Sequence, residues 1–204
     1  MKPFVIGICG GSGSGKTTLL KRLSSHFGNT EVAVFTMDNY YFPIEQQVKD
    51  TNGVVNFDLP TALNEKALSK DLKLLVEGEA IDVKEYFFNS PPDKNVLLTI
   101  VPKKIIIVEG LFLFYYKEVK ELIDFTVFVD VDMDTQLDRR IYRDQESRGY
   151  EESDIRYQWD NHVTPCYNDF IRPFKEEASF LYRNDKNGEK DLSSLLKELA
   201  KKRK

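Results

Sequence analysis

Apolar runs and helical repeats alternate along most of this chain. Largely apolar runs at residues 4–9, 31–37, 104–110, 125–130 and 178–182 predict strands, because strands covered on both faces of a sheet have no polar side. Apolar residues at helical spacing predict helices at about 16–27, from Leu63 to Gly78, at 115–123, at about 133–147, onward to about 169 after a break at 147–150, and at 192–199. This alternation favours an α/β fold, with a mostly parallel sheet and helices on both faces.

Two stretches depart from the alternation. The β-like runs 80–88 and 96–101 flank a Pro-containing turn and predict a small β-hairpin at about 80–101. The polar stretch 44–53 predicts a mobile loop. The pattern contains neither an internal repeat nor a linker, so we expect one domain over residues 1–204.

Composition excludes several classes of function. The formal net charge of −4 and the isoelectric point near 5.4 argue against a nucleic-acid-binding surface, which is usually basic. Cys9 and Cys166 form no metal-binding pattern and are expected to be buried thiols in a reducing compartment. His26 and His162 stand alone and are assigned neither a catalytic nor a metal role. The first strand begins close to Met1 and no apolar run approaches the roughly 18 residues of a membrane span, so we expect a cytoplasmic protein without a membrane partner.

The stretch 10–18, with the sequence GGSGSGKTT, joins the first predicted strand to the first predicted helix and matches the phosphate-binding pattern G-x-x-x-x-G-K-[ST]. Its glycines let several backbone N–H groups point inward, and the helix N-terminus adds about half a positive charge. Lys16 is expected to reach the β- and γ-phosphates and the Thr17 hydroxyl to hold Mg²⁺, with ATP as the expected nucleotide and GTP as the alternative. The predicted triphosphate-binding residues are Gly10, Gly11, Ser12, Gly13, Ser14, Gly15, Lys16, Thr17 and Thr18.

Two acidic residues follow strands at the edge where ligands bind in open α/β sheets. Glu109 ends an otherwise apolar strand, where a carboxylate is costly without a partner, and it is the candidate for the metal site. The alternative is a carboxylate that is merely exposed beyond the strand. Asp38 follows the second strand and is the candidate for the catalytic base that takes a proton from a hydroxyl group. Taken alone it could equally form a turn, because Asp-Asn is ordinary turn chemistry.

The predicted helix at 133–147 carries Arg139, Arg140 and Arg143, and Arg148 lies in the loop that follows. Spacings of three and four residues place such guanidinium groups on one side of a helix. Guanidinium matches phosphate through paired hydrogen bonds, so Arg143 and Arg148 are predicted to bind ATP from a lid at about 139–152. The alternative is a solvated helix face whose arginines pair with Asp138, Asp144 and Glu146.

Five segments of the chain together carry a family resemblance. Besides GGSGSGKTT, these are MDNYYFP, NFDLPTAL, IIIVEGLFLFYYKEV and FVDVDMDTQLDRRIYRDQESRG. In their order and sequence they resemble the uridine kinases (uridine–cytidine kinases), and the likeness covers nearly the whole chain. The P-loop alone occurs in many enzymes, whereas the ordered set is specific.

This resemblance implies roles for individual residues. Asp38 would be the general base for a ribose 5′-hydroxyl and would help Thr17 and Glu109 to hold hydrated Mg²⁺. Asp58 would bind the ribose diol, since one carboxylate can accept from two vicinal hydroxyls. The other residues implied are Tyr86 and Phe88 for the base, Arg140 and Gln158 beside the ribose, and Arg143 and Arg148 in the ATP lid. Family members are often tetramers, so the resemblance also implies a homo-oligomer.

Two positions depart from the family pattern. Pro91 stands where the family usually has a histidine that helps to read the pyrimidine edge, and Tyr150 stands where it has a further lid arginine. Pro91 has no side-chain hydrogen bond to offer, and Tyr150 carries no charge. A lost hydrogen-bonding partner can change discrimination by orders of magnitude, so the identity of the acceptor stays open.

The residues therefore predict an ATP-dependent phosphotransferase that acts on a small-molecule alcohol, and the resemblance implies a nucleoside that is phosphorylated at its 5′-hydroxyl. One alternative keeps this chemistry with another ribosyl or sugar-like alcohol, as in the related phosphoribulokinase group. A second alternative is a nucleotide switch or an ATP-binding homologue without catalysis. Asp38, Asp58 and the lack of an N-K-x-D segment argue against a switch.

Overall fold

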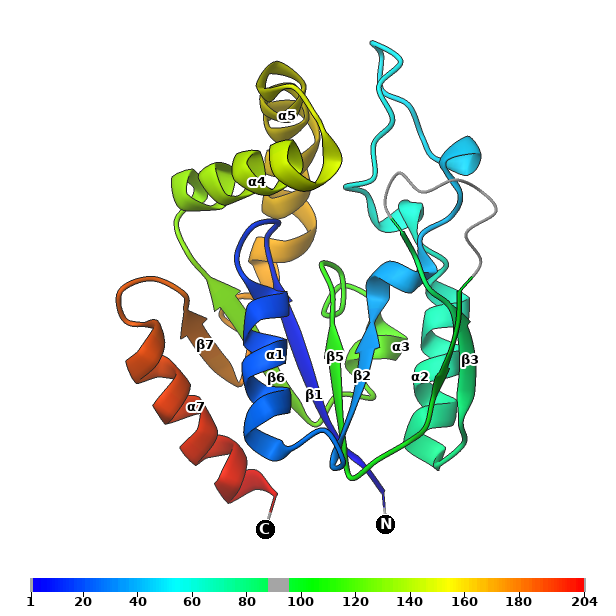
Figure 1. Ribbon diagram of the computed structural model, residues 1–204, viewed down its shortest axis with the longest axis vertical. Coiled ribbons are helices and arrows are strands. Elements are labelled where there is room, and N and C mark those ends of the chain that lie inside the picture. Colours follow the sequence, from blue (N-terminus) through cyan, green and yellow to red (C-terminus); the bar gives the residue numbers. More distant parts are fainter. Residues whose placement is uncertain (1, 88–95, 204) are drawn as a thin grey trace.

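A parallel β-sheet forms the centre of the molecule (Figure 1). The computed structural model describes residues 2–87 and 96–203, and in this part of the chain five parallel strands have the order β2–β5–β1–β6–β7. Their bounds are Phe4–Gly10 for β1, Val32–Thr36 for β2, Ile105–Glu109 for β5, Phe125–Asp130 for β6 and Phe180–Arg183 for β7. Because β1 is central, its carboxyl end opens onto the middle of the edge where ligands bind in α/β folds.

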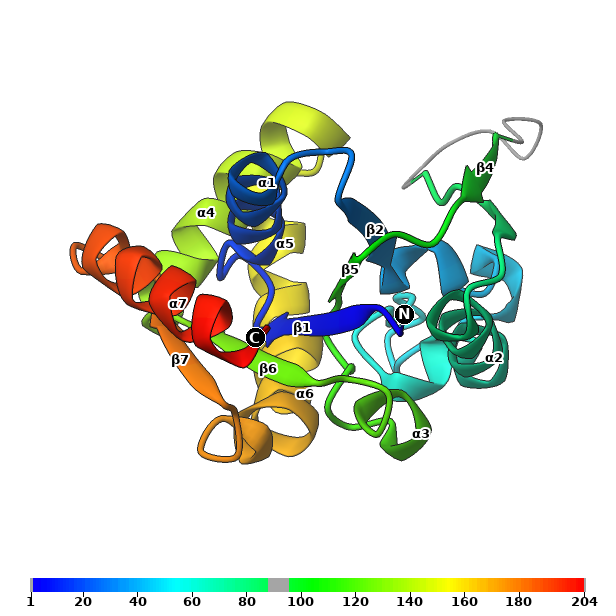
Figure 2. The same cartoon turned by 90° about the horizontal axis from the view of Figure 1, so that it is seen from below.

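Two apolar cores lie on opposite faces of the sheet, because alternate strand residues point to opposite sides. The helices that cover the faces include α1 (Lys16–Phe27), α2 (Glu65–Glu77), α3 (Lys117–Lys120) and α7 (Gly188–Lys202). Ile6 and Ile8 of β1 pack with α1 and α7, whereas Val5 and Cys9 pack with α2 and α3. Figure 2 shows these helices on either side of the sheet. The predicted α/β fold is confirmed.

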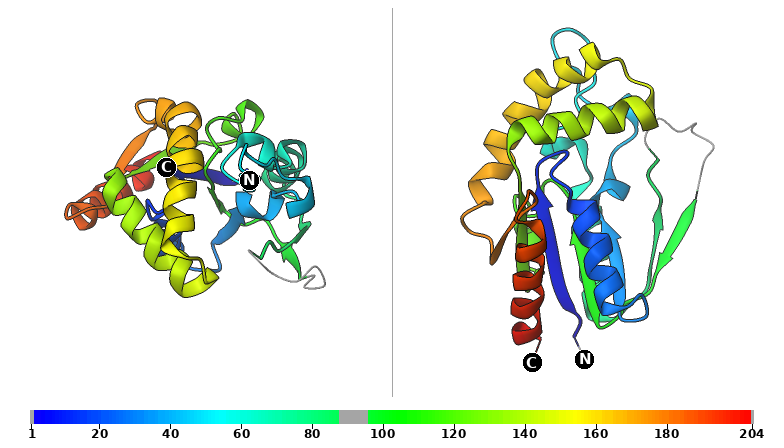
Figure 3. Two further views of the ribbon diagram at one scale, coloured as in Figure 1. Left: turned by 90° about the horizontal axis from the view of Figure 1, so that it is seen from above. Right: turned by 60° about the vertical axis from the view of Figure 1, so that its left-hand side comes forward.

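A helical lid lies across the carboxyl edge of the sheet (Figure 3). It consists of α4 (Met133–Arg148) and α5 (Glu152–Gln158), which meet at Gly149. The φ of 69° at Gly149 is a left-handed conformation that ends the helix and favours glycine. The helical path continues through the π-helical turn Trp159–Val163, α6 (Thr164–Cys166) and a second π-helical turn, Tyr167–Ile171. The predicted break at 147–150 thus coincides with the end of α4.

A small antiparallel hairpin lies beside the sheet rather than within it. β3 (Ile81–Lys84) pairs with β4 (Leu97–Ile100), as predicted, although both strands are shorter than the runs 80–88 and 96–101. The predicted tip of the hairpin, with Phe88 and Pro91, lies outside the described residues. Across the residues that the structure describes, no helix combines the length and the apolar character needed to cross a membrane.

Two predicted helices begin or end elsewhere. Residues 115–123 contain only the short α3, because Phe112, Phe114 and Tyr116 are buried in a turn instead of being spaced along one helix face. α2 begins at Glu65 instead of Leu63, since Asn64 caps it by accepting a hydrogen bond from the amide of residue 67. Consecutive apolar residues therefore misled the prediction at α3, and the capping residue corrects it at α2.

The stretch 44–53 was expected to be a mobile loop, but it is held at several points. Gln47 is buried and its side-chain amide donates to the carbonyl oxygens of Phe42 and Ala62. Lys49 and Val55 form an isolated β-bridge. Short 3₁₀ helices occur here and elsewhere at Met37–Tyr40, Ile44–Gln46, Pro60–Ala62 and Arg172–Phe174. These contacts hold the segment against the rest of the protein at Gln47 and near Lys49, while most of its other side chains are exposed.

Candidate active site

The turn between β1 and α1 has a backbone conformation that requires glycine at two positions. Gly13 and Gly15 have φ values of 77° and 97°, which residues with a side chain rarely adopt. A Cβ atom at Gly13 would collide with the backbone oxygen of Gln136, and one at Gly15 with the side chain of Asn184. The loop and its neighbours are therefore packed closely against each other, and the glycines permit the backbone conformations by which such loops direct N–H groups at an anion.

Lys16, the first residue of α1, lies over this loop. Its Nζ atom donates hydrogen bonds of 2.9 Å to the carbonyl oxygens of Gly10 and Gly11. The ammonium group thus lies at the carboxyl end of β1, where the lysine of a P-loop meets the β- and γ-phosphates.

The outer turn of the loop is braced by residues that lie far away in the sequence. Asn184 Nδ2 donates to the carbonyl oxygen of Ser14 at 2.6 Å, and Arg139 donates to the carbonyl oxygens of Ser14 and Asn184 at 3.4 and 3.0 Å. Arg139 therefore supports the loop from outside, a role that its place in the arginine-rich helix did not reveal.

The predicted metal-site residues lie together at the edge of the sheet. The Thr17 hydroxyl lies 3.3 and 3.4 Å from the two carboxylate oxygens of Glu109, and the Thr36 hydroxyl lies 3.5 Å from one of them. Thr36 and Glu109 are register partners in β2 and β5, and Asp38 follows two residues later, with its amide donating to Thr36 Oγ1. Glu109 is buried, so the alternative of a carboxylate exposed beyond the strand is wrong.

The protonation of both acids responds to this enclosure. Asp38 is reached by solvent through the mouth of a cleft, yet desolvation by the surrounding protein raises its pKa, against the opposing effects of Lys16, Arg148 and Arg143. Burial likewise raises the pKa of Glu109; Lys16 opposes the shift and Asp38 adds to it. Each carboxyl group therefore holds a proton more readily than an ordinary acid, which suits a group that is placed to accept a proton.

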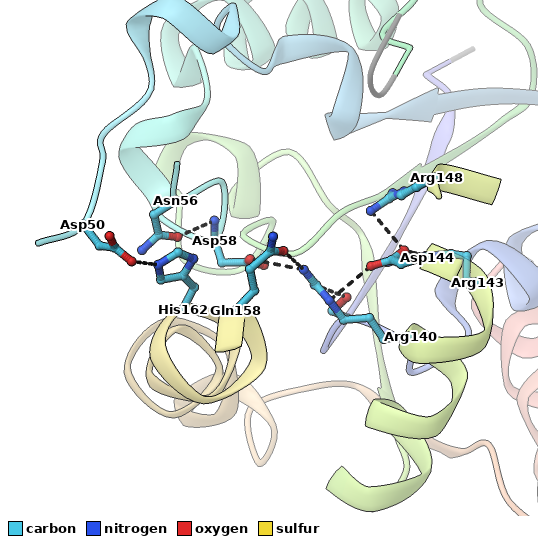
Figure 4. Close-up of polar contacts among 10 residues, drawn as sticks. Asp50, Asn56, Asp58, Arg140, Arg143, Asp144, Arg148, Gln158 and His162 are labelled. Atoms are coloured by element: carbon cyan, nitrogen blue, oxygen red, sulfur yellow. Dashed lines mark hydrogen bonds and ion pairs between the residues drawn. The ribbon is translucent and has the colours of Figure 1, made fainter. Parts of the chain in front are cut away.

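Three lid arginines surround one carboxylate, that of Asp144 (Figure 4). Arg143 Nε donates to Asp144 Oδ1 at 2.7 Å, and Arg148 Nη1 lies 3.2 Å from the same oxygen. Arg140 Nε lies 3.4 Å from Oδ2. The alternative interpretation expected pairing with Asp144, and this pairing is present, but Asp144 is 1% exposed instead of solvated. Three cations around one carboxylate leave a local excess of positive charge.

Arg140 also connects the lid to Asp58, the predicted diol-binding residue. Its Nη2 donates to Gln158 Oε1 at 3.1 Å and lies 3.9 Å from Asp58 Oδ2. Asp58 is buried, and its amide donates to Asn56 Oδ1 at 2.9 Å. Figure 4 shows Asp58, Arg140 and Gln158 directed toward one another from separate segments of the chain. The three residues assigned to the ribose side by resemblance are therefore brought together.

Aromatic side chains form the neighbouring wall. The Tyr41 ring lies 5.3 Å from the Tyr86 ring and 5.9 Å from the Phe57 ring, measured between centroids. The Tyr86 amide donates to Asn39 Oδ1 at 3.0 Å, which ties the hairpin to the segment that carries Asp38. Burial raises the pKa of Tyr86 to about 12, so its hydroxyl stays protonated and available as a donor. Tyr86 is where the resemblance places it, beside Asp58 in one cleft.

A single cavity of about 1140 Å³ joins these groups. Of the predicted site residues, its lining includes Ser12, Gly13, Gly15, Lys16, Thr17, Thr18, Asp38, Asp58, Tyr86, Glu109, Arg140, Arg143, Arg148 and Gln158. Gly10, Gly11 and Ser14 lie behind the lining in the buried part of the loop, and Phe88 lies outside the described residues. The sequence predictions thus converge on one site.

Sequence reasoning missed several residues of this cavity. Tyr41 and Phe57 lie inside the segments that carry the resemblance, but no spacing singles them out as a shared aromatic wall. Asn52 and Tyr157 also line the cavity and had no sequence signal, because their contact joins segments 105 residues apart. Tyr150, which stands where the family pattern has a further lid arginine, lines the cavity as well.

The glycine loop on β1, the oxygen-rich edge beside it and the arginine lid above it define the class of P-loop kinases. A family model described as the phosphoribulokinase / uridine kinase family matches residues 5–185. The chain belongs to that family.

Relatives of known name share about a third of their residues with this chain. A uridine kinase from Deinococcus deserti is 34% identical over 181 residues, covering 89% of this chain and 87% of the relative. A uridine kinase from Brevibacillus brevis is 35% identical over 179 residues, with 88% and 84% covered. Uridine-cytidine kinase B from Dictyostelium discoideum is 32% identical over 179 residues, with 88% and 74% covered.

Solved structures share the fold at lower identity. Phosphoribulokinase from Rhodobacter spheroides matches with a TM-score of 0.65 at 14% identity and covers 89% of this chain and 70% of its own. D-Glycerate 3-kinase from Cryptococcus neoformans matches with a TM-score of 0.63 at 16% identity, with 89% and 86% covered. These likenesses show the P-loop kinase fold.

Proposed function

We propose that this protein transfers the γ-phosphoryl group of ATP to the 5′-hydroxyl of a nucleoside of the uridine or cytidine type. One observation carries the proposal: a continuous cavity has the glycine loop and Lys16 at one end, Asp58 with an aromatic wall at the other, and Asp38 within reach of both. The names of the relatives, uridine kinase and uridine-cytidine kinase, support the acceptor.

The donor end fits ATP with Mg²⁺. Mg²⁺ prefers oxygen ligands, and the groups at this edge are the hydroxyl of Thr17 and the carboxylates of Glu109 and Asp38. Within residues 2–87 and 96–203, no cluster of three or more His, Cys, Asp or Glu side chains is arranged to hold a metal. Bound Mg²⁺ would therefore take much of its coordination from phosphate and water, and it would neutralise charge on the triphosphate.

Asp38 would accept the proton of the attacking hydroxyl. The acceptor oxygen forms the new bond to the γ-phosphorus, the bond from that phosphorus to the β–γ bridging oxygen breaks, and the proton goes to the Asp38 carboxylate. The raised pKa of Asp38 moves it toward the working range of a base. Tyr41 and Tyr86 lie near enough to Asp38 to feel its charge, which is where an acceptor held against the aromatic wall would present its hydroxyl.

Lys16 and the lid would stabilise charge on the transferred group. Arg143 and Arg148 share the Asp144 carboxylate with Arg140, so that their charge is only partly compensated. An incoming triphosphate would draw on this excess through charge-assisted hydrogen bonds. Catalysis would then consist of positioning and electrostatic stabilisation, as in other phosphoryl transfers.

The acceptor end favours an uncharged molecule with a diol and a flat ring. Arg140, the cation next to Asp58, is already engaged with Gln158 and Asp144, so among the described residues a phosphorylated sugar at this end would meet mainly acidic and aromatic groups. The Asp58 carboxylate can accept from two vicinal hydroxyls, and the rings of Tyr41, Phe57 and Tyr86 can bury the face of a base.

A panel of acceptors tests the proposal. The purified protein is incubated with radiolabelled ATP, Mg²⁺ and uridine, cytidine, 2′-deoxyuridine, adenosine or ribulose 5-phosphate, and the products are separated. We expect the 5′-monophosphates of uridine and cytidine, with less product from the 2′-deoxy compound because half of the diol is missing. Turnover confined to ribulose 5-phosphate would favour the sugar-phosphate alternative, and no turnover with any acceptor would favour a non-catalytic homologue.

A further inference from the structure

A second polar cluster lies at the outer end of the cavity, away from the glycine loop. It joins residues 44–58, which we name the strap, to the end of α5 and the π-helical turn that follows it. Asp50 Oδ2 accepts hydrogen bonds from the Tyr157 hydroxyl at 2.8 Å and from His162 Nε2 at 2.7 Å. Asn52 Nδ2 donates to the same tyrosine hydroxyl at 2.6 Å. Figure 4 shows the Asp50–His162 contact beside Asp58 and Gln158.

The hydrogen-bond pattern keeps the Asp50 carboxylate ionised. Asp50 Oδ1 accepts from the backbone amides of Asn52 and Val54, both at 2.9 Å, so four donors converge on one carboxylate. Partial burial opposes its ionisation, but the hydrogen bonds from Tyr157 and His162 lower the pKa of Asp50 to about 2. His162 can donate from Nε2 as the neutral tautomer or as the imidazolium, so the contact does not require a charged histidine.

The cluster connects the two walls that face the acceptor. On the strap, Asn52, Val54 and Phe57 line the cavity, and on the opposite wall Tyr157 and Gln158 do so. The His162 side chain is 2% exposed and that of Asp50 is 17% exposed, so the link is largely shielded from competition by water.

The cluster is also connected to the residues assigned to the ribose, because Tyr157 and Gln158 are neighbours in the chain. Gln158 follows Tyr157 directly and holds Arg140 at 3.1 Å, and Arg140 lies 3.9 Å from Asp58. Asp58 belongs to the strap. The strap is therefore joined to the helix directly at Asp50 and indirectly at Asp58, where Arg140 of α4 lies between Asp58 and Gln158.

We infer that Asp50 is a positioning residue for the acceptor: through Tyr157 and His162 it holds the strap against the helix, sets the width of the outer cavity and keeps Gln158 beside Arg140. The inference rests on the proposed function, because it concerns the acceptor end of that site. Among the described residues the cluster makes no direct contact with the glycine loop. The link between them runs through Gln158 and Arg140, and Arg140 donates to Ser12 Oγ at 3.0 Å, so the properties of the donor end serve as a control that lies further from the substitution.

Steady-state kinetics of Asp50→Asn, His162→Phe and their double variant test this inference. At position 50, Asn keeps an oxygen for the backbone amides that bond Oδ1, but its NH₂ group replaces Oδ2 and faces the two donors Tyr157 and His162. At position 162, Phe keeps a buried ring without a hydrogen-bonding nitrogen. Loss of a hydrogen bond to a charged group predicts a rise of about tenfold in the KM for uridine, with the KM for ATP and kcat within about twofold of the wild type. The double variant is expected to be no worse than Asp50→Asn alone, because His162→Phe removes only a contact that Asp50→Asn also removes.

Glu152→Gln is the matched control. It breaks an exposed ion pair with Arg156 on α5, and we expect its kinetic constants to equal those of the wild type. A rise in the KM for ATP equal to that for uridine in Asp50→Asn would overturn the positioning role, because it would indicate a general loss of structure. An unchanged KM for uridine would overturn it as well.

Hydrogen exchange gives a readout that does not depend on turnover. In the free protein, Asp50→Asn should speed amide exchange in the strap and at 157–163 while α1 exchanges as in the wild type. Equal exchange in the variant and the wild type would overturn the link itself. If the wild type phosphorylates no acceptor, the proposed function fails, and the exchange result alone then decides whether Asp50 holds the strap to the helix.

Discussion

The two ends of the cavity are built in different ways. The proposed donor end centres on nine consecutive residues, 10–18, whose backbone amides and single lysine suit any triphosphate; Glu109 and the lid arginines add to it. The acceptor end is made by side chains from the strap, the hairpin and the lid, which meet only in the folded chain. A local backbone motif binds the same chemical group wherever it occurs. A site assembled from separate side chains can acquire a different ligand through single substitutions. The donor end thus defines the reaction, and the acceptor end defines the substrate.

Removal of the lysine at the donor end is expected to have the largest effect. Lys16→Ala should lower kcat/KM by about 10³-fold, because a preorganised cation at the transferred group is lost. Single-turnover measurements with saturating acceptor would check this. Since the acceptor does not touch Lys16 in the proposed arrangement, equilibrium binding of uridine should be unchanged. A kcat/KM near that of the wild type would contradict the assignment of the donor end.

Asp38 lies where the two ends meet, and we expect its substitution to have the second-largest effect on turnover. Asp38→Asn should lower kcat by about 10²-fold while ATP still binds, because the base is removed but the glycine loop and Lys16 remain. The raised pKa of Asp38 also predicts a pH dependence. The base must be ionised, so kcat/KM should fall as the pH drops through the folded pKa, and this fall should begin at a higher pH than for an ordinary aspartate. The variant should lack this acid limb; an identical pH profile would remove Asp38 from the mechanism.

A change at the acceptor end should be smaller and confined to one substrate. Asp58→Ala removes the predicted diol contact and should raise the KM for uridine by about 30-fold, the size expected for lost hydrogen bonds to a charged group. The KM for ATP should change little. The comparison of uridine with 2′-deoxyuridine sharpens the result, because the variant should discriminate between them less than the wild type does. An effect on ATP alone would show that Asp58 serves the donor end.

The smallest predicted effect concerns stability. Because burial and Asp38 raise the pKa of Glu109 in the folded protein, its charge is disfavoured at neutral pH relative to the unfolded chain. Glu109→Gln should therefore raise the melting temperature slightly in the absence of ATP and Mg²⁺, and it should reduce the stabilisation that the two ligands give together. Thermal melts with and without MgATP measure both quantities. A lower melting temperature of the free variant would mean that the hydrogen bonds of Glu109 outweigh its desolvation.

The same contrast between local and assembled features explains which parts of the structure were predictable from the sequence. The strands and the glycine loop were predictable because apolar runs and a contiguous motif are local signals. The approach of Thr17 and Glu109 was predictable because the carboxyl ends of parallel strands share an edge. The cluster of Asp50, Tyr157 and His162 was not, since Asp50 lies more than 100 residues before the other two and none is unusual alone.

Local rules also failed in two instructive places. Asp144 reads as one acid among several on a charged helix, yet burial makes it the common partner of three arginines. The stretch 44–53 reads as a polar loop, yet Gln47 and Asp50 direct its polar groups into the protein. In both cases the polarity of the sequence was interpreted as contact with water, whereas the fold supplies protein partners.

The brace between Asn184 and Ser14 ties the ATP end to the chain's final fifth. Asn184 comes directly after β7, which follows the other four strands of the described sheet in chain order and lies at its edge. During synthesis, the glycine turn emerges first but lacks this support until β7 has paired with β6. Nucleotide affinity would consequently mature late, and a nascent or truncated chain would hold ATP loosely even though its signature motif is complete.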